Sequence, residues 1–341
     1  MTAKRHILLL IVIVLISGKL FSQDIHFTQF YNSPLTLNPA LTGNIDGNIR
    51  AALNHRNQWN SISVPFVTSS FSLDAKLMED RLKGDAVGAG IEIMNDKTGE
   101  GHLSNLQIMI SSSYHKYFGA EKNHMVALGI QAGFFQRKID FSKLSFASQY
   151  VDGDFNTNIS SGENTLNYTT GNFDINTGIF YQAEKTNNYN INGGFAVYHL
   201  TRPNESLLGE IAKVPLRYVF HMEAIYVLND KTKIRPDILY MTQNKAKAFT
   251  FEGRAEHTFK TIKDQPANII FGAGCRISDA IILITGFKYE KWDVCFSYDI
   301  NISKLHPASN YRGGFEISII FSGRVLHGKN KLPESVPCIR L

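Results

Sequence analysis

Five oxygen-bearing side chains between residues 152 and 163 have the spacing of a calcium-binding loop. Asp152, Asp154, Asn156, Asn158 and Glu163 occupy positions one, three, five, seven and twelve of that pattern. Carboxylate and amide oxygens at this spacing can wrap a hard cation. However, Thr157 stands where such loops carry glycine, and no helical pattern flanks the segment. The segment is a calcium candidate, but the commoner explanation is a polar surface loop, so we assign no metal and no other cofactor.

No other group of residues has the spacing of a catalytic centre. The Gly88–Gly90 and Gly272–Gly274 pairs are not followed by helical patterns, so they indicate close strand packing and not phosphate loops. No serine lies in a nucleophile elbow, and no histidine pair has the spacing of a zinc protease. His221 and Glu223 share one strand face, but polar residues are expected on one face of a half-buried strand. We therefore predict that the protein is not an enzyme.

The elements that carry these residues are predicted strands in which apolar residues alternate very regularly with small or polar ones. In the segment 292–302, large apolar residues alternate with small or polar ones. A period of two puts one set on each face of a strand. One face then suits lipid and the other suits water. The same alternation recurs in 173–181 and 315–321, with Asp174, Asn176, Glu316 and Ser318 predicted to face a polar lumen.

The pattern predicts an all-β fold of about fourteen strands that form a transmembrane antiparallel β-barrel. The expected strands are Asn48–His55, Val67–Lys76, Gly84–Asn95, Ser104–Phe118, His124–Lys138, Asn172–Glu184, Tyr189–His199, Arg217–Leu228, Thr232–Gln243, Lys247–Lys260, Ala267–Arg276, Ala280–Glu290, Trp292–Ile302 and Gly313–Ser322.

The chain begins with the three zones of a secretory signal. Lys4 and Arg5 form the positive start, 7–16 is an unbroken apolar core, and 18–22 is a small-residue cleavage region. An apolar core of this length is too short to span a bilayer, which takes about 20 residues. We expect cleavage near Ser22. An exported chain without a longer apolar helix is either soluble or a barrel, because lipid accepts only helices and closed sheets.

Composition agrees with a barrel. Aromatic residues make up 11% of the chain and charged residues only 19%, and barrels place aromatic residues in girdles at the two membrane interfaces. The net charge is +5, but the basic residues are scattered, so we expect no nucleic-acid partner. The three cysteines are an odd number and do not indicate a disulfide framework.

The expected joins alternate between short and long. Short, turn-like joins fall at 119–123, 185–188, 229–231 and 291, whereas the long ones fall at 56–66, 140–171, 200–216 and 303–312. Bacterial barrels have short periplasmic turns and long outer loops. We therefore expect both ends of the mature chain in the periplasm and long loops outside.

Residues between the signal and the first strand mix aromatic residues with turn formers, which suits a plug packed in the lumen. The expected division is a signal peptide (1–22), a plug segment (23–47), an outer-membrane barrel (48–322) and a periplasmic C-terminal tail (323–341). A plug argues against an open diffusion pore.

Several short elements recur along the chain in a fixed order. They are Gln29–Tyr31, Pro34, Asn38–Ala40 with Gly43, Arg56 with Gln58 and Trp59, Gln149–Tyr150, His199–Leu200 with Pro203, Gly313–Glu316, and Pro337 and Cys338 near the end. In these elements the chain resembles the PorP/SprF family of outer-membrane proteins of the type IX secretion and gliding machinery. The resemblance covers almost the whole mature chain.

The resemblance implies a barrel that works in protein export or in surface assembly of large adhesin-like proteins. Its partners would be outer-membrane lipid, other type IX secretion components on the periplasmic side and a large secreted client. We expect Asn38, Pro39 and Gly43 to fix the turn of the plug. Arg56, Gln58 and Trp59 would lie at the first outer rim, with Trp59 in the interface belt. His199 and Pro203 would set the exit into the second long loop.

Other functions stay open at this stage. The main alternative is a transporter of hydrophobic small molecules similar to the FadL family, which also carries an N-terminal plug with an Asn-Pro-Ala element. A general porin and a soluble β-sandwich are further alternatives.

Overall fold

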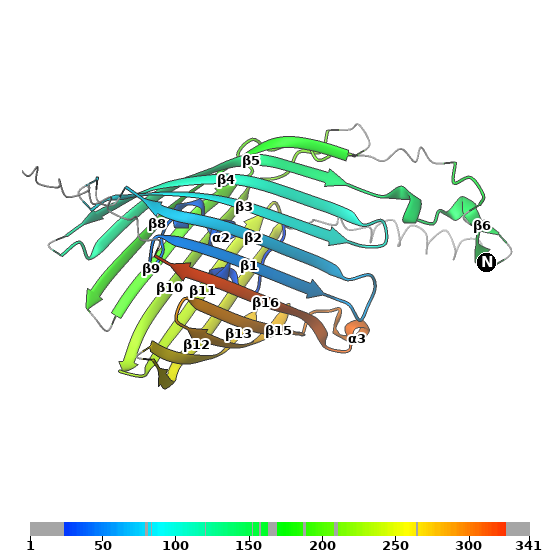
Figure 1. Ribbon diagram of the computed structural model, residues 1–341. Coiled ribbons are helices and arrows are strands. Elements are labelled where there is room, and N and C mark those ends of the chain that lie inside the picture. The colour runs from blue at the N-terminus through cyan, green and yellow to red at the C-terminus, as the bar shows by residue number, and fades with distance from the viewer. Residues whose placement is uncertain are drawn as a thin grey trace, which may run out of the picture.

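The computed structural model is a closed antiparallel barrel of fourteen strands, which confirms the predicted fold class (Figure 1). It describes residues 24–324 except 79–80, 83, 120, 152, 157, 163–168, 187–188, 208–210 and 264. The predicted signal peptide and C-terminal tail, with Pro337 and Cys338, therefore lie outside the described residues. Among the described residues, no helix is long and apolar enough to cross a membrane.

Each predicted strand corresponds to one barrel strand. The barrel strands are β1 (Ile49–Gln58), β2 (Phe66–Leu77), β3 (Ala86–Thr98), β4 (Leu103–Phe118), β5 (His124–Lys138), β8 (Thr169–Thr186), β9 (Tyr189–Tyr198), β10 (Arg217–Asn229), β11 (Thr232–Gln243), β12 (Ala246–Ile262), β13 (Gln265–Arg276), β14 (Ala280–Tyr289), β15 (Trp292–Asn301) and β16 (Arg312–Gly323).

Each strand pairs with its neighbour in sequence around the barrel, and β1 pairs with β16 to close it. Closure gives every strand two hydrogen-bonded neighbours, which a strand in lipid needs because no water is there to satisfy its backbone.

The apolar and polar residues that alternate in the sequence form the outer and inner faces of the barrel wall. Phe173 is 59% exposed on the outer face, whereas its neighbour Asp174 is 2% exposed on the inner face. Several charged side chains on the inner face form ion pairs with one another. For example, Arg254 Nη2 lies 2.8 Å from Asp237 and 3.2 Å from Glu223. The outer face can therefore contact lipid, while ion pairs such as these hold charged side chains on the inner face.

The long joins gather at one end of the barrel, which we call the long-loop end; the opposite end is the short-turn end. From β5 to β8 the chain extends furthest, through η3 (Phe141–Lys143), η4 (Ala147–Gln149) and a small hairpin of β6 (Tyr150–Val151) and β7 (Asp154–Phe155) (Figure 1). A short helix, α3 (His306–Ser309), lies between β15 and β16 at the same end.

Residues 24–47, the plug segment, lie inside the barrel. They form three short helices, η1 (Phe30–Asn32), α2 (Pro34–Leu37) and η2 (Pro39–Leu41), seen in blue behind the strands in Figure 1. Apolar side chains of the segment pack on two parts of the wall. Phe30 and Leu37 pack with Val219 and Leu239, and Ala40 packs with Phe180.

Candidate functional site

The plug segment is held to the last two strands by buried acidic side chains. Glu316 accepts hydrogen bonds from the backbone N–H of Thr28 at 2.7 Å and of Gln29 at 2.9 Å. Asp299 accepts from the Thr28 hydroxyl at 3.0 Å. Backbone N–H groups of a segment without regular structure need partners when they are buried. Glu316 supplies these partners, and together with Asp299 it fixes the height of the plug in the lumen.

Arg56 belongs to the same anchor, and this differs from its expected position at the outer rim. Its guanidinium is buried, lies 2.9 Å from Asp299 and donates to the backbone oxygen of His26. Arg276 reaches Asp299 at 3.1 Å from the other side. The period-two pattern of β1 alternates Arg56 with outward-facing neighbours, so its side chain points into the lumen and onto the plug.

The turn of the plug, which contains Asn38, Pro39 and Gly43, fits against small residues of the wall. Asn38 is fully buried, caps η2 by accepting from Ala40 N at 2.9 Å, and donates to the backbone oxygen of Ile179 at 3.0 Å. Gly43 has a φ of 72°, which favours glycine, and its N–H donates to Asp74 at 2.7 Å.

Four glycines in the wall make room for this turn. A β-carbon at Gly129 would lie 2.3 Å from Pro39, and one at Gly88 would lie 2.0 Å from the backbone oxygen of Thr42. Gly178 and Gly194 leave room for the Asn38 amide in the same way. The sequence had indicated close strand packing at Gly88–Gly90. The structure shows that the plug backbone also approaches this part of the wall.

The N-terminal end of the plug is fastened to the loop after β9 by a charged cluster. His199 lies between two carboxylates: its Nε2 is 2.6 Å from Asp24 and its Nδ1 is 2.6 Å from Asp174. Arg217 lies 3.5 Å from Asp24. His199 has a φ of 62°, an uncommon conformation for a residue with a side chain. Pro203 is buried further along this loop, and its backbone oxygen accepts from Val214 N at 2.9 Å.

Charge decides the protonation of this cluster. Burial lowers the pKa of His199, but the charge of Asp24 and hydrogen bonds to both carboxylates outweigh it and raise the pKa to about 9. Burial would raise the pKa of Asp24, but the nearby His199 and Arg217 bring it well below its usual value. At neutral pH the cluster is therefore a charged latch between the plug and the wall.

A cavity of about 720 Å³, which we call the vestibule, opens above the plug at the long-loop end. Asp24 to His26 of the plug line it, together with Arg56, Gln58 and Trp59. Trp59 is half-buried beside this space and makes an edge contact with Phe66, with ring centroids 5.0 Å apart. The lining contains charges of both signs: Asp24, Arg56, Asp96, Arg137, Glu205, Lys247, Arg276 and Asp279.

The calcium candidate is not tested by the structure. Asp152 and Glu163 lie outside the described residues. Asp154 belongs to β7, and the Asn156 side chain accepts from Asn158 N at 3.0 Å, as in an ordinary polar turn. Among the described residues, no group of three or more histidine, cysteine, aspartate or glutamate side chains is placed to hold a metal ion. Calcium binding by this loop stays a prediction.

A family model for the type IX secretion system membrane protein PorP/SprF matches residues 19–321, which include the plug and nearly the whole barrel. The chain belongs to the PorP/SprF family. It is an outer-membrane β-barrel of the type IX secretion system, and this confirms the family predicted from the motifs. Membership in PorP/SprF implies other type IX components as partners. No match was found among the curated proteins.

Several solved barrels resemble this PorP/SprF chain at low sequence identity. The CymD monoaromatic hydrocarbon channel is 11% identical, with a TM-score of 0.48 over 87% of this chain and 94% of that one. The Pseudomonas putida toluene transporter TodX is 9% identical, with a TM-score of 0.48 over 89% and 95%. A Pseudomonas aeruginosa FadL homologue is 11% identical, with a TM-score of 0.45 over 89% and 95%.

Proposed function

We propose that this barrel assists the export or surface assembly of large secreted adhesin-like proteins as a plugged scaffold in the outer membrane. Its long-loop end would face outward, and its short-turn end, with both chain ends, would face the periplasmic components of the type IX machinery. The observation that carries the proposal is the family match over residues 19–321.

The packing of the plug supports a scaffold and not an open channel. Among the plug residues, Gln29, Leu35, Asn38, Ala40 and Thr42 are fully buried or nearly so. They contact strands on opposite sides of the barrel, from β4 and β5 to β16. Moving the plug out would expose apolar side chains and leave Glu316 and Asp299 without their partners, which costs several kcal/mol.

The vestibule is the part of the scaffold that suits contact with a client or a partner protein. It combines arginine and aromatic side chains at the long-loop end, and these residue types are enriched where proteins bind one another. Its charges disfavour the alternative of a transporter for hydrophobic small molecules. A site for such solutes would be lined mainly by apolar side chains, because burying charged groups against an apolar ligand is costly.

The proposal is tested by deleting the gene, comparing the secreted proteome, and restoring the deletion strain with wild-type protein, Trp59→Ala or Trp292→Ala. The chain has only these two tryptophans, and Trp292 lies at the short-turn end on the outer face, 52% exposed. We expect deletion to remove one or a few large proteins from the medium and Trp59→Ala to lower their export severalfold. Trp292→Ala should export them normally.

Heat-modifiable migration of each variant in detergent gels will show that the barrel is folded in the membrane. An unchanged secreted proteome after deletion would contradict the proposal. Uptake of hydrophobic solutes by the purified barrel, or steady conductance in a bilayer, would favour a transporter instead. If Trp59→Ala removes the barrel itself, that residue has a structural role.

A further inference from the structure

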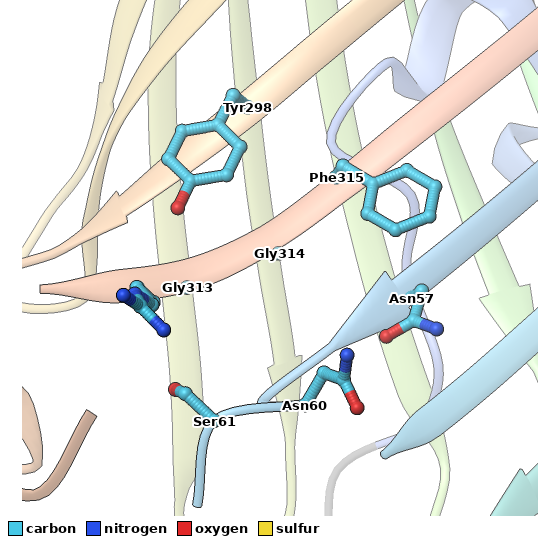
Figure 2. A pocket seen from close by; sticks show the side chains of 8 residues that line it. Asn57, Asn60, Ser61, Tyr298, Gly313, Gly314 and Phe315 are labelled. Carbon is cyan, nitrogen blue, oxygen red and sulfur yellow. The ribbon is translucent and has the colours of Figure 1, made fainter. Parts of the chain in front are cut away.

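A hollow of about 200 Å³ lies on the outer face of the wall, at the long-loop end of the seam where the first and last strands close the barrel. Figure 2 shows Phe315 on β16, Tyr298 on the neighbouring strand β15 to one side, and Asn57, Asn60 and Ser61 to the other side. Arg312 also lines the hollow. This hollow is separate from the vestibule, because it lies on the outer face and not in the lumen.

The barrel register explains why the hollow exists. Tyr298 pairs with Phe315, and Phe315 pairs with Asn57, so these three side chains form a row on one face across β15, β16 and β1. Tyr298 is 43% exposed and Phe315 is 48% exposed, which places the row outside the barrel. Next to this row, Gly313 carries no side chain to fill the surface, and the backbone of Gly314 also lines the hollow.

The two glycines are held there by the backbone. A β-carbon at Gly313 would lie 2.4 Å from the backbone oxygen of Asp299, and one at Gly314 would lie 2.8 Å from the backbone oxygen of Asn57. The register of β15 and β16 also shifts here, between Asp299 and Ile300. The bulge admits only small residues, so the hollow is a fixed feature of the wall.

Two polar groups at the hollow have unused capacity for hydrogen bonds or ion pairs among the described residues. Asn57 Oδ1 is buried and accepts no hydrogen bond from the described residues, although a buried acceptor normally has a partner. Arg312 is exposed, and its guanidinium forms no salt bridge within the described part of the chain. An anion beside Arg312 and a hydroxyl donor beside Asn57 would satisfy both, and the rings of Tyr298 and Phe315 would contact apolar chains.

We propose that this hollow binds the headgroup of a membrane lipid that carries both phosphate and sugar hydroxyls. Arg312 would bind the phosphate, Asn57 would accept from a hydroxyl, and Phe315 would contact the acyl chains. The site lies where the strands leave the apolar band, which is the level at which headgroups lie. The orientation proposed above places it in the outer leaflet, beside a phosphorylated glycolipid.

The test is native mass spectrometry of the purified barrel in detergent with a diphosphorylated disaccharide glycolipid, its dephosphorylated form, and soluble glucosamine 1-phosphate. We expect the diphosphorylated lipid to be retained and the dephosphorylated lipid to bind about tenfold more weakly, since a charge-assisted contact is lost. Arg312→Gln should bind both lipids equally weakly. Asn57→Leu should weaken the binding of both forms of the lipid, but the diphosphorylated form should still bind more tightly than the dephosphorylated one.

Arg202→Gln is the matched control, because Arg202 is also exposed at the long-loop end but lies in the loop after β9, away from the hollow. It should bind like wild type. Retention of the diphosphorylated lipid by Arg312→Gln at the wild-type level would overturn the proposal. Competition by soluble glucosamine 1-phosphate at the same concentration would overturn the assignment to a lipid. Heat-modifiable migration of every variant excludes misfolding as the cause.

Discussion

The side-chain Oδ1 of Asn38 lies in the space that a side chain at Gly178 would occupy, since a β-carbon there would be 2.0 Å from it. The same amide donates to the backbone oxygen of Ile179, the next residue of β8. The turn of the plug therefore fits against the wall because residue 178 has no side chain. On β5, Gly129 makes room for Pro39 in the same way, since a β-carbon at Gly129 would lie 2.3 Å from Pro39.

Gly178→Ala should destabilise the barrel by about 1–3 kcal/mol, because the added methyl group forces the plug turn away from β8. The urea midpoint of the detergent-solubilised protein measures this. Gly253→Ala is the matched control, because a β-carbon there meets no atom within 4 Å. It should change stability by less than about 0.5 kcal/mol. Equal effects of the two substitutions would mean that the plug does not press on β8.

The contact between Asn38 and Gly178 should also appear as non-additivity. Asn38→Ala removes the amide that blocks position 178, so Gly178→Ala should cost about 1 kcal/mol less in that background than in wild type. A double-mutant cycle of unfolding free energies measures the difference. Strict additivity would show that the two residues do not interact directly.

Arg56→Met should destabilise the protein by about 3 kcal/mol, because it removes a buried partner of Asp299 and leaves the oxygen of His26 with fewer donors. Lys116→Met is the comparison: Lys116 is ion-paired with Asp85, but its side chain is 61% exposed. Lys116→Met should lower the free energy of unfolding by less than about 1 kcal/mol. Similar losses for the two variants would place Arg56 at a solvated rim, as first expected from the sequence.

The latch at His199 should respond to pH in a defined direction. The pKa of His199 is raised to about 9, so its stabilising contribution is complete below about pH 6.5, the unfolded pKa, and is lost as the pH rises through 9. The pKa of Asp24 is lowered, so its contribution is complete above about pH 4 and is lost in more acidic solution. Asp174, Arg217 and Glu205 complete the charged surroundings.

Hydrogen exchange of the backbone at residues 24–28 measures this response. We expect protection to be highest between about pH 4 and 6.5 and to fall towards pH 10, after correction for intrinsic exchange. In His199→Gln, the fall in protection towards pH 10 should be absent. Protection that stays constant from pH 6 to pH 10 in wild type would show that the latch does not depend on the charge of His199.

The sequence predicted the barrel well because the decisive signal is local. A strand between lipid and a polar lumen must alternate at every second residue, as Phe173 and Asp174 do, and that alternation can be read without knowing any partner. The plug could be expected for a similar reason, since apolar residues and turn formers before the first strand need a place to pack.

The anchoring of the plug could not be predicted, because it depends on residues far apart in the chain. Thr28 and Glu316 meet only after closure sets the register of β1 against β16. The position of Arg56 was misjudged because its motif ends at the loop, whereas its side chain points inward. The vestibule and the outer hollow are likewise shapes formed between strands, and no spacing in the sequence encodes them.

The attachment of the plug to β16 has a consequence for biogenesis. The plug segment is synthesised before every barrel strand, yet two of its partners, Glu316 and Ser318, lie on β16, the last of these strands. Its contacts with β16 therefore form only after that strand has been made and has paired with β1. Sealing of the cylinder and completion of this attachment become one event, so a chain truncated before β16 would leave both unfinished.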